Sequence, residues 1–158
     1  TGHTYSVLSL IINRDDELIS GSADNTIKLW NMTTGEVKRT LTGHTGSVNS
    51  LVLNKNDELI SGSHDKTIKV WDIKSGREIK TLIGHKNYIY SLVINKDNEL
   101  ISGSADNTIK IWNMSTCEIK TTLIGHTNSV HALLIKNENQ LISGSMDKSI
   151  KIWNQVKI

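Results

Sequence analysis

Four tryptophans, Trp30, Trp71, Trp112 and Trp153, stand 41 residues apart along the chain. A Gly-His pair keeps the same step, beginning at Gly2 and recurring three times. A fixed period of this length, shared by several residue types, is the signature of a repeat architecture. We therefore predict a single array of four repeats without a second domain. The repeats span about residues 2–42, 43–83, 84–124 and 125–158.

Within each repeat, the hydrophobic pattern alternates over short stretches and never keeps a 3.6-residue step over the length of a helix. In the second repeat this pattern predicts strands over residues 47–53, 58–63, 67–72 and 78–82. Asn, Asp, Lys and Gly residues fill the stretches between them, as expected for short hairpin loops. Four such strands make one small antiparallel sheet. A single sheet of this size cannot bury both of its faces, but copies stacked around an axis can.

The recurring residues of each repeat resemble the WD40 repeat of β-propellers. Each repeat carries a Gly-His pair, a Ser-Gly-Ser-x-Asp turn and a (Thr or Ser)-Ile-Lys-x-Trp strand that ends in Asp or Asn. Only Trp71-Asp72 spells the signature dipeptide; Asn follows the other three tryptophans and keeps the size and hydrogen-bonding ability of Asp. The resemblance covers essentially the whole chain. It implies an all-β fold of four propeller blades, each a four-stranded antiparallel sheet.

A His, a Ser, an Asp and a Trp recur at constant offsets in every repeat. The four tetrads are His3, Ser20, Asp24, Trp30; His44, Ser61, Asp65, Trp71; His85, Ser102, Asp106, Trp112; and His126, Ser143, Asp147, Trp153. Ser, His and Asp together could form a hydrolytic triad. A catalyst needs one exposed nucleophile, however, whereas a repeat needs each copy to fix its own loops. The WD40 resemblance implies the second role, with the indole, hydroxyl, imidazole and carboxylate joined in one internal hydrogen-bonded chain.

Composition and spacing argue against several other classes of function. We expect no metal or cofactor site, because His126 and His131 lack further ligands at suitable spacing and Cys117, the one cysteine, stands where two other repeats have Gly. A formal net charge of +2, spread along the chain, argues against nucleic acid as a partner. The apolar runs are too short to span a membrane. The lone cysteine favours a reducing, intracellular and cytoplasmic setting. We expect no enzymatic activity.

Positions beside the tetrads that differ between repeats are not dictated by the blade, so they are the candidates for binding a partner. In WD40 propellers, similar positions surround the mouth of the central channel. The candidate partner-binding residues are Tyr5, Leu8, Asn49, His64, Tyr88, Tyr90, His131 and Met146. Aromatic and Met side chains are frequent anchors of interfaces. An alternative reading is that Tyr88 and Tyr90 only pack between neighbouring blades.

The last repeat ends about where its fourth strand would begin, so we expect fifteen strands and an incomplete last blade. Residues 155–158 could form a short outer strand. An arc of four blades would also leave two apolar faces bare at its ends. Two copies would supply the eight blades of a closed ring, and we therefore expect a homodimer. The alternative is that the sequence is a fragment of a longer propeller.

The function that these features favour is a non-enzymatic scaffold. Such a scaffold would bind a protein or peptide on the loop face that carries the His and Asp of each blade. The alternatives are a carbohydrate-binding propeller, a purely structural one, or the regulatory domain of a larger signalling protein. No residue of the chain identifies the partner.

Overall fold

The structure, a computed structural model, describes residues 2–137 and 140–154. Within these ranges the chain forms strands and no helix. The first two sheets contain β1 (Val7–Ile12), β2 (Leu18–Ser22), β3 (Ile27–Trp30), β4 (Val37–Leu41), β5 (Val48–Leu53), β6 (Leu59–Ser63), β7 (Thr67–Asp72) and β8 (Arg77–Ile83). The last two contain β9 (Ile89–Ile94), β10 (Leu100–Ser104), β11 (Thr108–Asn113), β12 (Glu118–Ile124), β13 (Val130–Asn137), β14 (Gln140–Ser145) and β15 (Ile150–Asn154).

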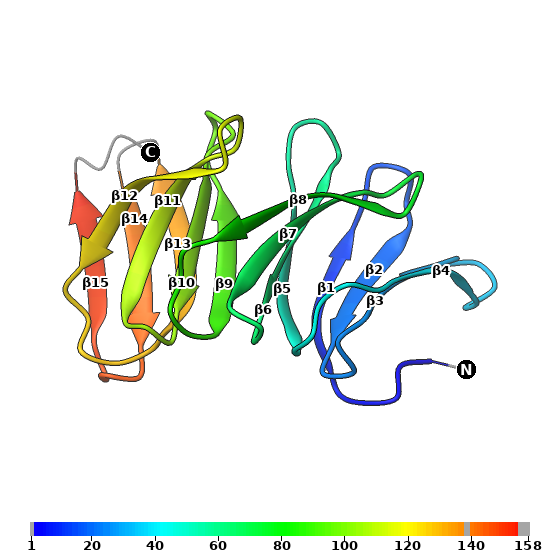
Figure 1. Cartoon of the computed structure of the whole chain (residues 1–158), viewed down its shortest axis with the longest axis horizontal. Coiled ribbons are helices and arrows are strands. Elements are labelled where there is room, and N and C mark those ends of the chain that lie inside the picture. The colour runs from blue at the N-terminus through cyan, green and yellow to red at the C-terminus, as the bar shows by residue number, and fades with distance from the viewer. Residues whose placement is uncertain (1, 138–139, 155–158) are drawn as a thin grey trace.

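Each sheet is an antiparallel meander in which consecutive strands pair, and the four sheets follow one another in a row (Figure 1). The first strands of neighbouring sheets, β1, β5, β9 and β13, lie next to one another along the row. The prediction of an all-β fold built from four small antiparallel sheets is confirmed. In the second repeat, the third strand has the predicted bounds, and no other strand end differs from its prediction by more than one residue.

Three kinds of tight turn join the strands and place residues in the left-handed backbone region. The turn between the first and second strands holds Asp16, Asp57 and Asn98 in this region. The turn between the third and fourth strands holds Gly35 at φ 71°, Gly76 at φ 76° and Cys117 at φ 61°. Glycine adopts this conformation without steric cost, whereas an L side chain does not. Cys117 therefore stands in a glycine position, as the sequence predicts. In the turn between the second and third strands, Asn25, Lys66, Asn107 and Lys148 are left-handed.

Three hydrophobic cores lie between neighbouring sheets, because the side chains of one sheet pack against those of the next. In the first of these cores, Ile27 and Leu29 of one sheet meet Val48, Leu51 and Trp71 of the next. The second and third cores repeat this arrangement with the residues found 41 and 82 positions later. Stability therefore comes from contacts between repeats, as expected for a repeat protein.

The last sheet has three strands within the described residues, β13, β14 and β15. The predicted outer strand over residues 155–158 lies outside the described residues. In Figure 1 the first sheet lies at the right-hand end of the row and the last sheet at the left-hand end. The row is an open arc, and within the described residues no further sheet packs on the outer face of the first sheet or of the last.

Candidate functional site

In every sheet the structure joins the four tetrad residues into one hydrogen-bonded chain. In the second sheet the Trp71 indole Nε1 donates to Ser61 Oγ at 2.8 Å, Ser61 Oγ lies 2.7 Å from His44 Nε2, and His44 Nδ1 lies 2.6 Å from Asp65 Oδ2. The other three sheets repeat these contacts at 2.7–2.8 Å. This series of hydrogen bonds therefore links the third strand to the second strand, to the loop before the first strand and to the turn after the second strand.

The direction of each hydrogen bond follows from the chemistry of the groups. A carboxylate only accepts, so His44 Nδ1 must carry the proton that bonds Asp65. The indole N–H only donates, so Ser61 Oγ accepts from Trp71 and uses its own proton to bond His44 Nε2. Ser61 is fully buried. Although the Ser-His-Asp distances resemble those of a hydrolytic triad, this hydroxyl has its partners inside the sheet and no substrate can reach it.

The tetrad carboxylates are held in their ionised form. Burial acts to raise the pKa of Asp65, but the hydrogen bonds from His44 and Thr67 outweigh it, and the pKa of Asp65 lies well below its usual value. The pKa values of Asp24, Asp106 and Asp147 are lowered in the same way, chiefly by bonds from neighbouring hydroxyl, imidazole and backbone N–H groups. Hydrogen bonds to the charged form of a carboxylate favour that form, so each tetrad Asp is a fixed negative group in its turn.

Two members of this network were not predicted. The Thr67 hydroxyl donates a hydrogen bond to Asp65 Oδ1 at 2.7 Å, and the Asp65 backbone N–H donates one to Ser63 Oγ at 3.0 Å. The signal was present in the sequence, because a Thr or Ser stands two residues after every tetrad Asp and a Ser stands two residues before it. These residues fix the turn that carries the carboxylate.

Beside the tetrads, four aromatic rings from three sheets contact one another and form what we call the aromatic ladder: His64, Tyr88, Tyr90 and His131. His64 stacks on Tyr88 with 4.3 Å between ring centroids, and Tyr90 stacks on His131 at 3.9 Å. His64 also meets the edge of Tyr90 at 5.6 Å. Desolvation by burial lowers the pKa of His64, which favours its neutral form.

The ladder lies on the tetrad end of the sheets. The His64 amide donates to Ser47 O and the Ala105 amide donates to Tyr88 O, and His64 and Ala105 each precede a tetrad Asp. The rings bridge neighbouring blades, as the packing interpretation predicts, yet Tyr88 keeps 41% of its surface exposed and His131 is exposed too. The ladder therefore packs between blades and also presents aromatic surface to solvent.

The remaining candidate residues do not join the ladder. Asn49 donates its side-chain amide to Ile89 O at 2.8 Å, a hydrogen bond between blades. Tyr5, just before β1, and Leu8 of β1 are exposed, and Met146 is exposed in the turn after β14. The structure thus brings together four of the eight candidates and places three others at the two ends of the arc.

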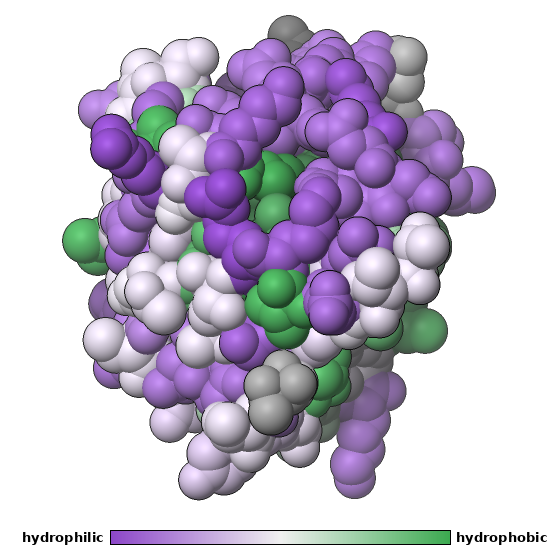
Figure 2. Space-filling view, turned by 90° about the vertical axis from the view of Figure 1, so that its right-hand side faces the viewer, coloured by the Kyte–Doolittle hydropathy of each residue, from purple (hydrophilic) through white to green (hydrophobic). Residues whose placement is uncertain are grey.

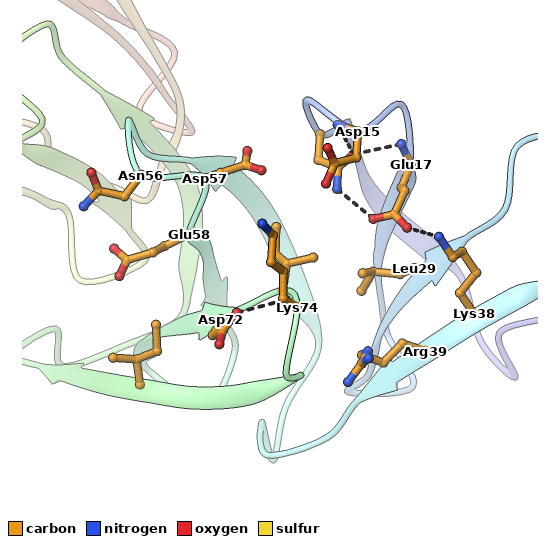
Figure 3. Close-up of a pocket in the computed structure, with 13 residues that line it drawn as sticks. Asp15, Glu17, Leu29, Lys38, Arg39, Asn56, Asp57, Glu58, Asp72 and Lys74 are labelled. Carbon is orange, nitrogen blue, oxygen red and sulfur yellow. Dashed lines mark hydrogen bonds and ion pairs between the residues drawn. The ribbon is translucent and has the colours of Figure 1, made fainter.

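A cleft of about 640 Å³ opens between the first two sheets at the loops opposite the tetrads (Figure 3). Its walls carry both signs of charge, and Figure 3 shows Glu17 and Lys38 directed toward each other. A hydrogen bond from Lys38 lowers the pKa of Glu17, whereas Asp72 accepts bonds from Ser75 and Lys74 of its own turn. Glu17 and Asp72 thus have protein partners, whereas Asp57, which also lines the cleft, has a buried Oδ1 without a hydrogen-bond partner among the described residues.

Among residues 2–137 and 140–154, no three or more His, Cys, Asp or Glu side chains are grouped so that they could hold a metal ion. They also include no helix of the length and apolarity needed to cross a membrane.

Sequence comparison decides the family. The sequence model named WD40, described as "WD domain, G-beta repeat", matches residues 1–31, 35–72, 76–113 and 117–154. The chain belongs to the WD40 family. The repeating tetrads are therefore the structural network of four WD40 blades. The positions beside them that differ from one repeat to the next are not part of that network.

Two curated relatives of this WD40 chain match it over about one repeat. They are the tRNA (guanine-N(7)-)-methyltransferase non-catalytic subunit wdr4 of Dictyostelium discoideum, 50% identical over 42 residues, and the probable E3 ubiquitin ligase complex SCF subunit sconB of Talaromyces marneffei, 54% identical over 41 residues. These matches cover 25% and 26% of this chain but only 9% and 6% of the relatives. Both names denote subunits of complexes.

Two solved structures share the WD40 arrangement over almost the whole chain. The computationally designed Ika4 protein is 37% identical with a TM-score of 0.85, and the match covers 97% of this chain and 93% of Ika4. The U3-55K structure is 26% identical with a TM-score of 0.88, and the match covers 100% of this chain and 50% of U3-55K. WD40 repeats together with relatives that act as subunits of complexes indicate a protein-interaction scaffold.

Proposed function

We propose that this WD40 chain binds an extended peptide segment of a partner protein on its tetrad end, with the aromatic ladder as the main contact surface. We also propose that the chain acts as a homodimer. The observation that carries the binding site is the ladder itself. Its rings come from three different sheets and converge at positions that the tetrads leave free to vary.

The ladder has the chemistry of an interface anchor. Tyr and His present large, rigid rings that lose little conformational entropy when a partner covers them. Their stacking on one another fixes their orientation before a partner arrives. The tetrads support this arrangement, because each holds the turn that carries the position next to its Asp. A partner side chain with an aromatic or aliphatic group would therefore meet a preformed surface.

The names of the relatives support the same role in broad terms, since one is a non-catalytic subunit and the other a subunit of a ligase complex. The buried hydroxyls of the tetrads fit this role as well, because all four serve the sheets.

The test is selection of peptides from a random dodecapeptide phage library on the immobilised chain. The affinities of the selected peptides are then measured for the Tyr88→Ala and Tyr90→Ala variants. We expect at least a tenfold loss of affinity in each variant, as for truncation of an interface anchor. The matched control is Met32→Ala, an exposed side chain in the turn after β3, at the opposite end of the sheets.

Thermal unfolding of every variant is measured alongside binding. Selected peptides that bind Tyr88→Ala and Tyr90→Ala as well as they bind the unchanged chain would refute the ladder as the binding surface. A large loss of stability with unchanged affinity would assign the rings to packing between blades alone.

A further inference from the structure

The cleft between the first two sheets opens at the end of the sheets opposite the aromatic ladder, so it is separate from the proposed peptide site. Both of its walls belong to consecutive sheets of this chain. Figure 2 views the molecule from the side on which the first sheet lies. It shows mostly hydrophilic side chains over the upper part of this face, the end at which the cleft opens, with hydrophobic side chains in a hollow between them. An occupant of the cleft would therefore contact both charged and apolar groups.

A glutamate with the same local support stands before the second strand of each of the first three sheets. In each case an Asn four residues earlier donates its side-chain amide to the Glu carboxylate at 2.6–2.9 Å and accepts the Glu backbone N–H at 2.7–2.9 Å. The three pairs are Asn13–Glu17, Asn54–Glu58 and Asn95–Glu99. The three carboxylates are therefore held in the same place by the same contacts.

In the first and third repeats, a lysine of the fourth strand forms an ion pair with this carboxylate. Lys38 pairs with Glu17, and Lys120 pairs with Glu99. The two Glu side chains are only 17% and 16% exposed. A carboxylate with so little access to water is stabilised by a cation beside it. Each of these two repeats thus supplies its own cation.

The second repeat has an isoleucine, Ile79, at the position of these lysines. Ile79 is 43% exposed and lines the cleft together with Glu58. Within residues 2–137 and 140–154, the Glu58 carboxylate has one partner, the Asn54 amide on Oε2. Its other oxygen, Oε1, has no partner in these ranges and is open to solvent. The cleft therefore contains a positioned carboxylate without the lysine of the other two repeats.

The other charged groups of the cleft do not replace this lysine. Arg39 donates to a backbone oxygen of the turn after β7 at 2.6 Å. Lys74 belongs to the same turn, and Figure 3 shows the Glu58 carboxylate directed away from Lys74. Asp57 adds a second negative charge next to Glu58, and its buried Oδ1 has no hydrogen-bond partner in the part of the chain that the structure describes. This wall of the cleft therefore favours a cation.

We propose that the cleft binds a lysine side chain of a partner protein, with the ammonium group on Glu58 and the aliphatic stem along Ile79. The partner would supply the cation that Lys38 and Lys120 supply in their own repeats. An ammonium group on a flexible aliphatic stem fits a carboxylate that has apolar carbon beside it. The site does not depend on peptide binding at the ladder.

The probe is the tripeptide acetyl-Gly-Lys-Gly-amide, titrated into the chain and followed by NMR of isotope-labelled isoleucine methyl groups. We expect saturable shifts of the Ile79 signal, whereas the signal of Ile83, at the other end of β8, should stay in place. The matched peptide carries norleucine, which has the stem of lysine without its charge. It should bind at least about fivefold more weakly, because it cannot pair with Glu58.

Two variants remove the site in different ways. Glu58→Gln keeps an oxygen for the Asn54 amide but loses the charge, and it should weaken binding of the lysine peptide at least about fivefold. Ile79→Lys restores the ion pair of the other two repeats, so the chain's own ammonium group should exclude the peptide. The matched control is Ile83→Lys, because Ile83 is an isoleucine of the same strand and is 75% exposed. It adds the same charge and should bind the peptide as the unchanged chain does.

Absence of saturable shifts at Ile79 would overturn the inference, and so would equal affinities for the lysine and norleucine peptides. Unchanged binding by Ile79→Lys would also overturn it, since Glu58 would then not be the contact. Tighter binding of the matching arginine peptide would overturn the assignment to lysine. Tyr90→Ala should bind the lysine peptide as the unchanged chain does, because the ladder lies at the other end of the sheets. Failure of the proposed function and failure of this inference are therefore distinguishable.

Discussion

The hydroxyl of Ser61 is the most informative single group in the tetrads, because it joins two buried partners at once. It accepts from Trp71 Nε1 at 2.8 Å and bonds His44 Nε2 at 2.7 Å, and all three residues are buried. Ser61→Ala removes one oxygen and leaves both the indole N–H and the imidazole nitrogen without a partner. Each buried polar atom that loses its partner costs about 1–3 kcal/mol. We therefore expect a loss of about 2–6 kcal/mol in the free energy of unfolding.

Urea denaturation at a fixed protein concentration measures this loss, since association also shifts the apparent stability. Ser102→Ala should lose the same amount, because Ser102 makes the same two bonds at 2.7 and 2.8 Å in an equally buried site. Ser115 is the control: it is exposed, and its backbone amide keeps its bond to Asn113 in Ser115→Ala. An ordinary surface substitution changes the free energy of unfolding by no more than about 0.5 kcal/mol. A change as small as this in Ser61→Ala would refute the reasoning.

Two further predictions concern the turns. Cys117→Gly should raise the free energy of unfolding by about 0.5–1 kcal/mol in the same urea experiment, because φ is 61° at Cys117 and glycine adopts this conformation without strain; a loss of stability would contradict this. The lowered pKa of Asp65 makes its stabilising effect complete above the carboxyl pKa of the unfolded chain, about 3.9, and weaker as the pH falls below that value. The urea midpoint of Asp65→Asn should therefore lie well below that of the unchanged chain at pH 7 and closer to it at pH 3, and a constant difference would exclude a role for the charge.

The tetrads could be predicted from the sequence because their members keep constant offsets. Constant offsets in a repeat mean that the same contacts form in every copy, so finding the network once predicts it four times. The Thr or Ser that supports each tetrad Asp is equally periodic, so the same reasoning applies to it.

The aromatic ladder could be predicted only as a set of positions. His64 and Tyr90 are 26 residues apart and belong to different repeats, and their contact depends on how two sheets pack and which rotamers their rings adopt. The repeat period alone does not show that Leu8 and Met146 are far apart. They occupy the positions of Tyr90 and His64, which touch because their sheets are consecutive, whereas the first and last described sheets are not in contact.

Val7 and Val48 allow one chemical change to separate folding from association. The two valines occupy the same position in consecutive repeats, but Val48 is buried in the first core and Val7 is exposed. Val48→Ala should therefore lower the free energy of unfolding by about 2 kcal/mol, the effect of removing two buried methyl groups with partial collapse of the space. Val7→Ala removes the same atoms from a face that this chain leaves bare. If a second copy covers Val7, its truncation should weaken the dimer in light-scattering titrations while leaving the unfolding of the diluted monomer unchanged. Equal effects of the two substitutions on the monomer would mean that Val7 is buried by its own chain, and the open arc would be wrong.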